Sequence, residues 1–496
     1  MHRILRVTLC VLALLPAAAQ AQLSRYDDLA NTPFDGGYPT RDGITALQDE
    51  LFYQRAVQVY IWALPALNLM AMKEGAEKKF GAGYNVLAIW KDRLNAKTLI
   101  TTPNADVIYG LGFLDLAKDG PMVIEVPPQL QGILDDLFQR PICSIGQIEG
   151  RQWCGDVGLP GPDHGKGAKY VVVPPDYKGQ LPAGYLPFRS RSYTVMVFLR
   201  AFFKDPKQLA EPVALMEKAR IYPLGKEATA KKMEFPNASN VPVDMLYPKD
   251  GTAFDMLSRI VEHEYVDPQD MEMRGMAAAL GIAKGAPFKP DDKARKLLDL
   301  AAKTASRMGL VVAYQPSALV PNALWYPDRR WVNVFPGNAT FTADSFNHID
   351  ARTGFFTNAY SASPGMAINM ENVGAKYPVT FVDAKGDFLM GDKSYRISLP
   401  KDIPAALFWS VTAYDSLTAA EVDNGQPFSS INTMDKPAAN ADGSTDIHLG
   451  PQSPGEGKNW IATVPGKGFF VILRLYGPTK AFFDKSWKPS DIEPIQ

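Results

Sequence analysis

The sequence predicts a mainly β protein with α insertions, built from two antiparallel β-sandwich domains of jelly-roll type joined by a helical middle segment. Short runs rich in Val, Ile, Tyr and Phe alternate with Gly and Pro turns over residues 106–202 and again over residues 376–478. Apolar residues between these regions recur at helical spacing. Neither strand-rich region has helices between consecutive strands, which favours antiparallel sandwiches over a parallel sheet.

The chain begins with a pattern typical of an export signal. Arg3 and Arg6 precede the apolar run VTLCVLALLP, and small residues end in Ala19-Gln20-Ala21. The apolar run is shorter than the roughly 20 residues that cross a bilayer. We therefore expect a signal peptide over residues 1–21, a mature chain that starts at Gln22 without a membrane span, and a periplasmic or secreted location.

A helical pattern opens the mature chain. Apolar residues follow helical spacing from Leu47 to Met72, and Pro65 lies within the run. Because proline lacks a backbone donor and its ring strains the preceding turn, we expect one long kinked helix or two short ones.

Four strands are expected next, in DVIYGLGFL, GPMVIEV, AKYVVVPP and SYTVMVFLRAF. They complete an N-terminal domain over residues 22–205. The following region, residues 206–339, is predicted to be helical, with a cap at Asp205 and a long amphipathic helix in DDKARKLLDLAAKTASRMGLVVAY. Strand patterns in KSYRISLP, ALFWSVTAYD, STDIHLG and GFFVILRLYGP then define a C-terminal domain over residues 340–496.

Two cysteines, Cys143 and Cys154, follow the expected cleavage point, with ten residues between them. An exported protein with this spacing is a candidate for one local disulfide. Two buried free thiols are the alternative. Two cysteines are too few for a disulfide scaffold or a cysteine-based zinc site, and we expect no metal.

Charge excludes one class of partner. The chain carries 52 Lys and Arg against 53 Asp and Glu, a net charge of −1. A protein that neutralises many phosphates needs a basic surface, so we expect no nucleic-acid partner. The segment GPDHGKGA has neither the spacing nor the final Ser or Thr of a phosphate loop. Common hydrolase motifs are missing as well, and no motif specifies a cofactor.

Three segments carry a family resemblance: TTPNADVIYGLGFLDL, DVGLPGPDHGKGAKYVVVPPDYKGQLPAGY and the terminal block FWSVTAYD with NWIATVPGKGFFVILRLYGP. The chain resembles the tandem of domain of unknown function 1254, over roughly residues 50–205, and domain of unknown function 1214, over roughly residues 370–490. The resemblance implies the same domain order and β-sandwich folds. It implies no particular reaction.

Polar residues at the start of an apolar strand give the main candidate site. Asn104, Asp106 and Tyr109 lie in TPNADVIYG, and Arg200 ends the strand YTVMVFLR. Asn and Asp side chains commonly cap turns. Alternatively, they bind a ligand together with Arg200, whose guanidinium pairs with carboxylates. We expect any small-molecule site here, in the N-terminal sandwich, closed by the helical middle segment.

The C-terminal domain offers a second set, made of Trp409, Tyr414, Trp460, Arg474 and Tyr476. Aromatic faces bind sugars or apolar rings, but the same residues form sandwich cores. We assign Trp409 to the core. Trp460 lies in a Pro- and Gly-rich loop and is the better ligand candidate.

Other polar patterns are weaker. Asp156 and Asp163 lie in a glycine-rich loop that fits either calcium binding or, more simply, side-chain-capped turns. His348 with Asp350 and His448 with Asp446 are spaced to share a face if extended, as a surface hydrogen bond or as a catalytic pair.

Three functions remain open on the sequence. The chain is an enzyme that uses an Asp or His on a small organic or glycan ligand, a non-catalytic module that binds such a ligand, or an envelope assembly protein that oligomerises. A deep pocket that gathers Asp106, Tyr109 and Arg200 would favour the enzyme.

Overall fold

The computed structural model describes residues 17–315, 320 and 322–495. The basic and apolar parts of the predicted signal peptide, residues 1–16, lie outside the described residues. Within the described part of the chain, no helix has the length and apolar character needed to cross a membrane.

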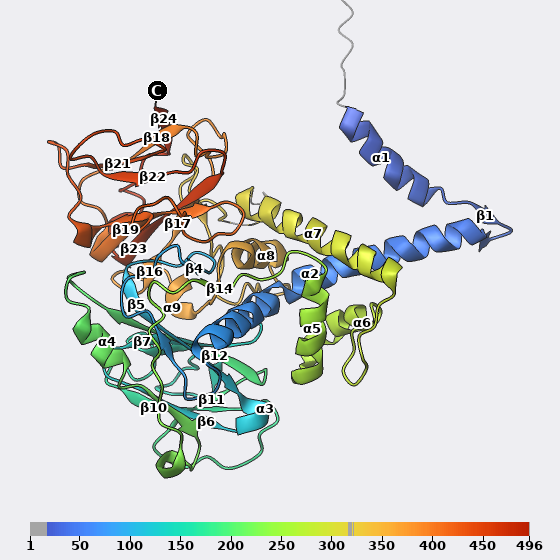
Figure 1. Ribbon diagram of the computed structural model, residues 1–496, viewed down its shortest axis with the longest axis horizontal. Helices are drawn as coiled ribbons and strands as arrows, with labels where there is room; N and C mark the ends of the chain where they lie inside the picture. Colours follow the sequence, from blue (N-terminus) through green and yellow to red (C-terminus); the bar gives the residue numbers. More distant parts are fainter. Residues whose placement is uncertain (1–16, 316–319, 321, 496) are drawn as a thin grey trace, which may run out of the picture.

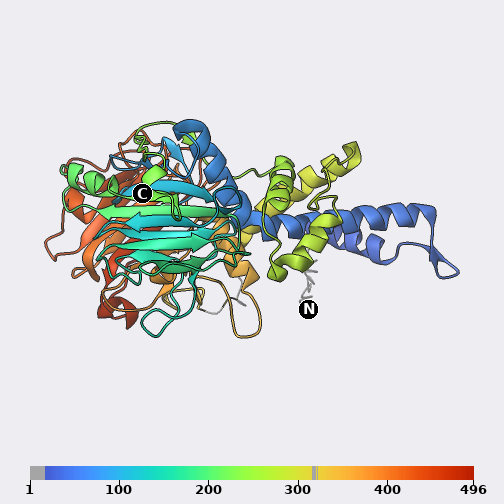
Figure 2. The same ribbon diagram turned by 90° about the horizontal axis from the view of Figure 1, so that it is seen from below.

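In its described residues the protein is mostly β, with several sheets and about ten helices, and Figure 1 shows how they are arranged. Two β-rich parts lie one above the other, and the helices α8 (Ile349–Asn358) and α9 (Pro364–Ala367) lie between them. A helical arm projects to one side of this body (Figure 2). None of the sheets of the described residues closes into a barrel.

Two five-stranded sheets form the N-terminal β-rich part. One, which we call the inner sheet, has the order β3 (Ala88–Ile89), β5 (Val107–Asp115), β12 (Thr194–Phe202), β7 (Gln131–Asp136), β9 (Asp156–Gly158). The other has the order β13 (Arg220–Pro223), β6 (Met122–Val126), β10 (Ala168–Val173), β11 (Leu186–Arg189), β8 (Cys143–Ser144). All four predicted strands of this region are present.

Side-chain alternation gives the inner sheet two different faces. Val195, Val197 and Leu199 of β12 pack in one apolar core with the second sheet. Met196 and Phe198 join another core, which contains the helices. Successive strand residues point to opposite faces, so one strand serves both layers.

The C-terminal β-rich part also has two main sheets. The inner one has the order β15 (Val332–Asn333), β17 (Pro378–Thr380), β23 (Phe469–Pro478), β19 (Ala405–Asp415), β20 (Ser430–Asn432), and β16 (Ala375–Lys376) also pairs with β23. The outer one has the order β22 (Trp460–Ala462), β21 (Thr445–Gly450), β18 (Ser394–Leu399), β24 (Glu493–Ile495). The predicted C-terminal strands are present.

The sheets are mixed, whereas the sequence analysis expects purely antiparallel ones. β10 and β11 pair in parallel, as do β21 and β22. Parallel neighbours require a crossover, and the irregular connections over residues 174–185 and 451–459 provide it without a helix. A short parallel pair also joins β4 (Thr98–Leu99) to β14 (Val243–Asp244).

The predicted first helix is one continuous helix, α2 (Arg41–Phe80), which passes through Pro65. The carbonyl oxygen of Pro65 accepts a hydrogen bond from Nε2 of Gln139, 2.8 Å away. The helices that surround α2 are α5 (Thr252–His263), α6 (Met271–Ala278), α7 (Asp292–Tyr314) and α8. α7 begins after Asp291, whose carboxylate accepts a hydrogen bond from the backbone N–H of Ala294.

The helix expected after Asp205 begins later, as α4 (Ala210–Met216). The Asp205 carboxylate accepts from the backbone N–H of Lys207 and closes a turn there. Smaller elements complete the fold: α1 (Ala17–Ala30), the hairpin of β1 (Phe34–Asp35) and β2 (Tyr38–Pro39), α3 (Leu116–Asp119) and α10 (Lys480–Phe483).

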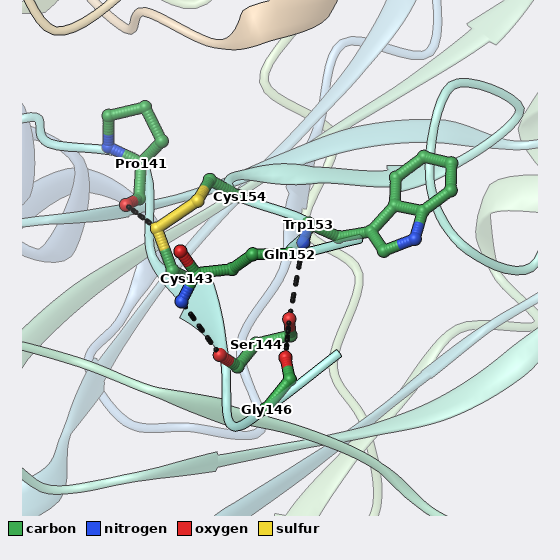
Figure 3. Close-up of a disulfide and its surroundings, with 7 residues drawn as sticks. All are labelled: Pro141, Cys143, Ser144, Gly146, Gln152, Trp153 and Cys154. Carbon is green, nitrogen blue, oxygen red and sulfur yellow. Dashed lines mark hydrogen bonds between the residues drawn. A yellow bond between two sulfur atoms is a disulfide. The ribbon is translucent and has the colours of Figure 1, made fainter. Parts of the chain in front are cut away.

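The predicted disulfide between Cys143 and Cys154 is present (Figure 3), with Cα atoms 3.9 Å apart. Residues 143 and 154 are also bridged in antiparallel register, which brings the two side chains together. The hydroxyl of Ser144 accepts from the backbone N–H of Trp153 and donates to the carbonyl of Gly146. The disulfide therefore closes a compact loop at the edge of the second N-terminal sheet.

Candidate functional site

A cavity lined by described residues lies between the two β-rich parts. Its volume is about 360 Å³, within the range of small-molecule sites. One wall comes from the inner N-terminal sheet, the other from the inner C-terminal sheet, and α7 and α8 contribute to the sides. Most of the lining is aliphatic or aromatic, with a few polar groups among it.

The N-terminal wall is polar at one point. Arg200 on β12 is directly opposite Tyr109 on β5 and Gln131 on β7, so three adjacent strands present these side chains together. The Arg200 guanidinium lies 5.9 Å from the centre of the Tyr109 ring and 5.0 Å from that of Phe198. Aromatic rings at these distances favour a cation.

The C-terminal wall is formed by alternate residues of β23. Phe470, Ile472, Arg474 and Tyr476 line the cavity. The residues between them in the strand, including Leu473, pack in the core between the two C-terminal sheets. The period of two thus places an arginine and a phenol on the cavity side of an otherwise apolar strand.

The turn before β5 combines both roles that the sequence suggests. The Asn104 Oδ1 accepts from the backbone N–H of Asp106 at 3.0 Å, which is an Asx turn. The Asn104 side chain also donates to the Tyr109 hydroxyl at 2.5 Å. Asn104 and Tyr109 both line the cavity. The turn therefore fixes the position of one cavity phenol.

Asp106 lies behind the cavity wall and is not part of the lining. Its side chain is fully buried. The carboxylate accepts hydrogen bonds from Ser410 Oγ at 2.6 Å, Asn432 Nδ2 at 3.0 Å and, more weakly, Tyr476 Oη at 3.5 Å. All three donors belong to the C-terminal part. Asp106 therefore connects the two β-rich parts.

Further polar contacts hold the same turn against the C-terminal sheet. Arg474 donates from Nη2 to the carbonyl of Thr102 at 3.1 Å and from Nη1 to Thr412 Oγ1 at 3.3 Å. The Tyr414 hydroxyl donates to the carbonyl of Pro103. The end of the cavity near Arg474 is thus fixed by both halves of the chain.

The two cavity arginines have no carboxylate partner at ion-pair distance in the part of the chain that the structure describes. The Nε atom of each is buried without a hydrogen-bond partner. Burial raises the pKa of Tyr109, and it does the same for Tyr360 and Tyr476. These phenols stay protonated at neutral pH and serve as neutral hydrogen-bonding groups.

The fifth ligand candidate, Trp460, lies elsewhere. It belongs to β22 in the outer C-terminal sheet, is half-buried, and its Nε1 donates to the carbonyl of Gly450 at 2.9 Å. It does not line the cavity. Trp409 is in the core between the C-terminal sheets, where the sequence analysis puts it.

The weaker polar patterns are used within the fold. Asp163 accepts from the backbone N–H of Gly167 at 3.0 Å and from the Tyr170 hydroxyl. Asp156 accepts from the backbone N–H of Gly365 at 2.7 Å. Among the described residues, no three His, Cys, Asp or Glu side chains gather as metal ligands. Asp350 lines the cavity, whereas His348 and His448 do not.

Arg474 and Tyr476 are the residues that the sequence analysis undervalues, since it explains the C-terminal set by packing. Their position in FFVILRLYGP contained a signal. Both fall on the same phase of a strand whose other phase is uniformly apolar, and a buried arginine on one face of a central strand requires a partner.

These features define a two-part, β-rich protein with an apolar cavity between its parts. The family profile described as protein of unknown function (DUF1254) matches residues 84–223, and the profile described as protein of unknown function (DUF1214) matches residues 374–480. The two profiles match the chain in the order DUF1254 then DUF1214, as its sequence motifs predict. No match was found among curated proteins.

Solved structures support the fold only. The VPA0106 protein from Vibrio parahaemolyticus is 17% identical and has a TM-score of 0.51, covering 90% of this chain and 100% of its own. An uncharacterised protein from Burkholderia cenocepacia is 14% identical with a TM-score of 0.39, covering 97% of each chain. The VPA0106 protein shares the overall fold of this chain. The TM-score of the second structure is too low to show a common fold.

Proposed function

We propose that this chain binds a small, mainly apolar organic molecule in the cavity between its DUF1254 and DUF1214 parts. The observation that carries the proposal is the composition of the cavity wall, which combines apolar side chains with a few convergent polar groups from both parts. This composition is typical of small-molecule sites. A glycan is less well matched, because its many hydroxyls need more polar partners than this lining offers.

Binding accounts for the site better than catalysis does. The expected acid or base, Asp106, is held by donors of the fold and lies outside the lining. The titratable groups of the two sheet walls are arginines and protonated phenols, which bind and orient a ligand, and the carboxylate of the lining, Asp350 on α8, is exposed.

We also propose that the protein is exported after cleavage at Ala21, and that each β-rich part is a sandwich of its two main sheets. Support for export comes from the sequence of residues 1–21. Support for the sandwiches comes from the apolar clusters shared by each pair of sheets. The mass of the protein isolated from its native host tests export, since it should correspond to a chain that starts at Gln22.

A cavity-filling variant tests the binding proposal. Ala351 on α8 lines the cavity, and Ala351→Phe should fill part of it. We expect the neutral fluorophore N-phenyl-1-naphthylamine to bind the wild type with enhanced emission and to bind Ala351→Phe at least about tenfold more weakly. The matched control is Ala278→Phe, an exposed position on α6. Equal binding of the fluorophore by the wild type and both variants would show that it does not bind in this cavity.

Assembly is a second candidate, favoured by the helical arm. Tyr26, Phe34 and Tyr38 are exposed on α1 and the β1–β2 hairpin, beside the projecting end of α2 (Figure 2). Exposed aromatic groups on a projection are suited to contact a second copy of the chain. Light scattering after size-exclusion chromatography tests this, because Phe34→Ser with Tyr38→Ser should convert an oligomer to a monomer. A monomeric wild type would end this candidate.

A further inference from the structure

Arg200 is a partly buried cation with a fully buried Nε atom, and its close neighbours are aromatic. Its guanidinium lies near the rings of Tyr109 and Phe198, and Tyr377 lines the same cavity. Asp156 lies within electrostatic range of Arg200, but its carboxylate accepts a hydrogen bond from the backbone N–H of Gly365. Arginine in such surroundings keeps its charge, because guanidinium is not deprotonated in proteins. The charge therefore lacks a direct counter-ion.

Arg474, on the opposite wall of the cavity, also lacks a direct counter-ion. It is 3% exposed, and the partners of its N–H groups are the neutral oxygens of Thr102, Thr412 and Pro103. Asp106 lies within electrostatic range, but its carboxylate is bound by Ser410 and Asn432.

The two guanidinium groups act on one region of the cavity. Both influence the hydroxyls of the same three tyrosines, Tyr109, Tyr360 and Tyr377. Tyr109 and Tyr377 line the cavity together with both arginines. Two cations and several phenolic donors thus face one polar region in a cavity that is otherwise apolar. Buried charge of this kind is stabilised when an anion completes its hydrogen bonds.

We propose that the natural ligand is an organic carboxylate with an apolar body, whose carboxylate is held between Arg200 and Arg474 and whose body fills the apolar part of the cavity. This inference rests on the proposed binding function and adds the chemical class of the ligand. Guanidinium matches a carboxylate in shape and donates charge-assisted hydrogen bonds to it.

A singly charged head fits this environment better than a doubly charged one. Asp106 and Asp156 are close enough to influence the arginines, and they would repel a second negative charge on the ligand. Burial raises the pKa of Asp156 to about 6, and Arg200 acts against that rise. A monocarboxylate is therefore favoured over a phosphate monoester.

The apolar part of the cavity lining indicates the chemistry of the rest of the ligand, beyond its carboxylate. Phe335, Val379, Phe381, Phe470 and Ile472 belong to the cavity wall and carry no hydrogen-bonding side chains. A chain or ring of carbon atoms gains about 25 cal/mol for each Å² that it buries there. The carboxylate then determines the orientation of the bound molecule.

The test compares two probes of nearly equal size, n-octanoate and its neutral amide, octanamide. Each probe displaces N-phenyl-1-naphthylamine from the wild type at about pH 7.5, where octanoate is ionised. We expect octanoate to bind at least about tenfold more tightly than octanamide, because hydrogen bonds to charged groups are the stronger ones. Equal displacement by both probes would overturn the carboxylate proposal while leaving the cavity as an apolar binding site.

Variants of the two arginines test whether Arg200 and Arg474 cause the preference for octanoate over octanamide. Arg200→Gln should retain fluorophore binding but lose the preference for octanoate, and Arg474→Gln should do the same if it folds. Arg352→Gln is the matched control, since Arg352 on α8 is half-buried and lies outside the cavity lining. A preference that survives in Arg200→Gln contradicts the proposal. Failure of the wild type to bind the fluorophore would instead count against the binding function itself.

Discussion

Asp106 illustrates how a residue type is predictable while its role is not. The sequence placed it at the entrance of an apolar strand, and it is there. Its donors, Ser410 and Asn432, lie more than 300 positions further along the chain. A single sequence contains no signal for such a pairing, so a carboxylate that joins the two halves resembles a ligand-binding carboxylate.

Asp106→Asn should destabilise the protein rather than change ligand selectivity. The asparagine amide presents a donor where Ser410 and Asn432 already donate, so buried donors lose their acceptor. Such a loss costs about 1–3 kcal/mol of unfolding free energy. Urea denaturation measures it, with the exposed Asp344→Asn as control, for which a change within about 0.5 kcal/mol is expected. A fully stable Asp106→Asn protein would show that the contact contributes nothing.

Glu421 is a buried acid with an unusual environment. It is 3% exposed, and neither carboxyl oxygen has a hydrogen-bond partner in the described part of the chain. Burial raises the pKa of Glu421 to about 8, against the opposing effect of Arg474. The side chain is therefore mainly neutral at pH 7 in the folded protein and ionised in the unfolded chain.

The stability of the wild type should consequently fall as pH rises between about 5 and 8, relative to Glu421→Gln. In this window the folded state keeps a proton that the unfolded state has released, and the slope approaches 1.4 kcal/mol per pH unit at most. Glu421→Gln removes that titration. Urea midpoints of both proteins at the two ends of the window measure the difference. Parallel pH profiles would show that Glu421 titrates normally.

At the scale of elements, local pattern predicted most of the longer strands and the long helix α7, because each has a clear period and end signals. It left open whether Pro65 divides α2, which tertiary packing decided in favour of a continuous helix. It also missed the parallel pairs, since strand direction depends on the path of irregular connections. The sequence indicated some of the residues that line the cavity, but it did not indicate which strands form walls that face each other.

One contact between elements is close enough to exclude any side chain. Gly75 on α2 packs on the segment of β14, and a Cβ atom at this position would lie 2.2 Å from the carbonyl oxygen of Asp244 and 3.0 Å from Cγ of Met245. The first of these neighbours is backbone and cannot rotate away. Glycine is therefore required for α2 to approach the strand at this distance.

Gly75→Ala should lower the free energy of unfolding by about 1–3 kcal/mol, because the helix and β14 must separate to admit the methyl group. The control is Gly275→Ala on α6, where a Cβ would meet no atom within 4 Å. There the gain in helix propensity should stabilise the protein by up to about 1 kcal/mol. Chemical denaturation of both variants tests the opposite signs. Two changes of the same sign would contradict the close approach.

At the scale of the whole molecule, the two family domains are not separate bodies. One apolar core includes Tyr60 from α2, Tyr109 and Phe198 from the N-terminal sheet, and Phe408 and Tyr476 from the C-terminal one. The Phe202 and Phe408 rings, from opposite parts, lie 6.4 Å apart. Relative domain motion is the usual expectation for tandem domains, but a shared apolar core opposes it.

Polar contacts with defined geometry also join the N-terminal and C-terminal β-rich parts. Arg93 pairs with Asp435 at 2.8 Å, and the Asp135 carboxylate accepts from the hydroxyl of Ser361 at 3.1 Å. Together with the contacts of Asp106, they fix the two inner sheets against each other and set the width of the cavity. A ligand in this cavity would touch both family regions at once.

The protein should therefore unfold in one cooperative transition. If either half lost its structure first, it would expose the shared core and leave Asp106 and Asp135 buried or half-buried without their donors. Scanning calorimetry should give a single peak whose calorimetric and van't Hoff enthalpies agree. Octanoate should shift the whole peak to higher temperature, because a ligand held by both walls stabilises both halves together. Two separate transitions, or a shift confined to one of them, would mean that the halves fold independently and that the cavity walls are not held in one body.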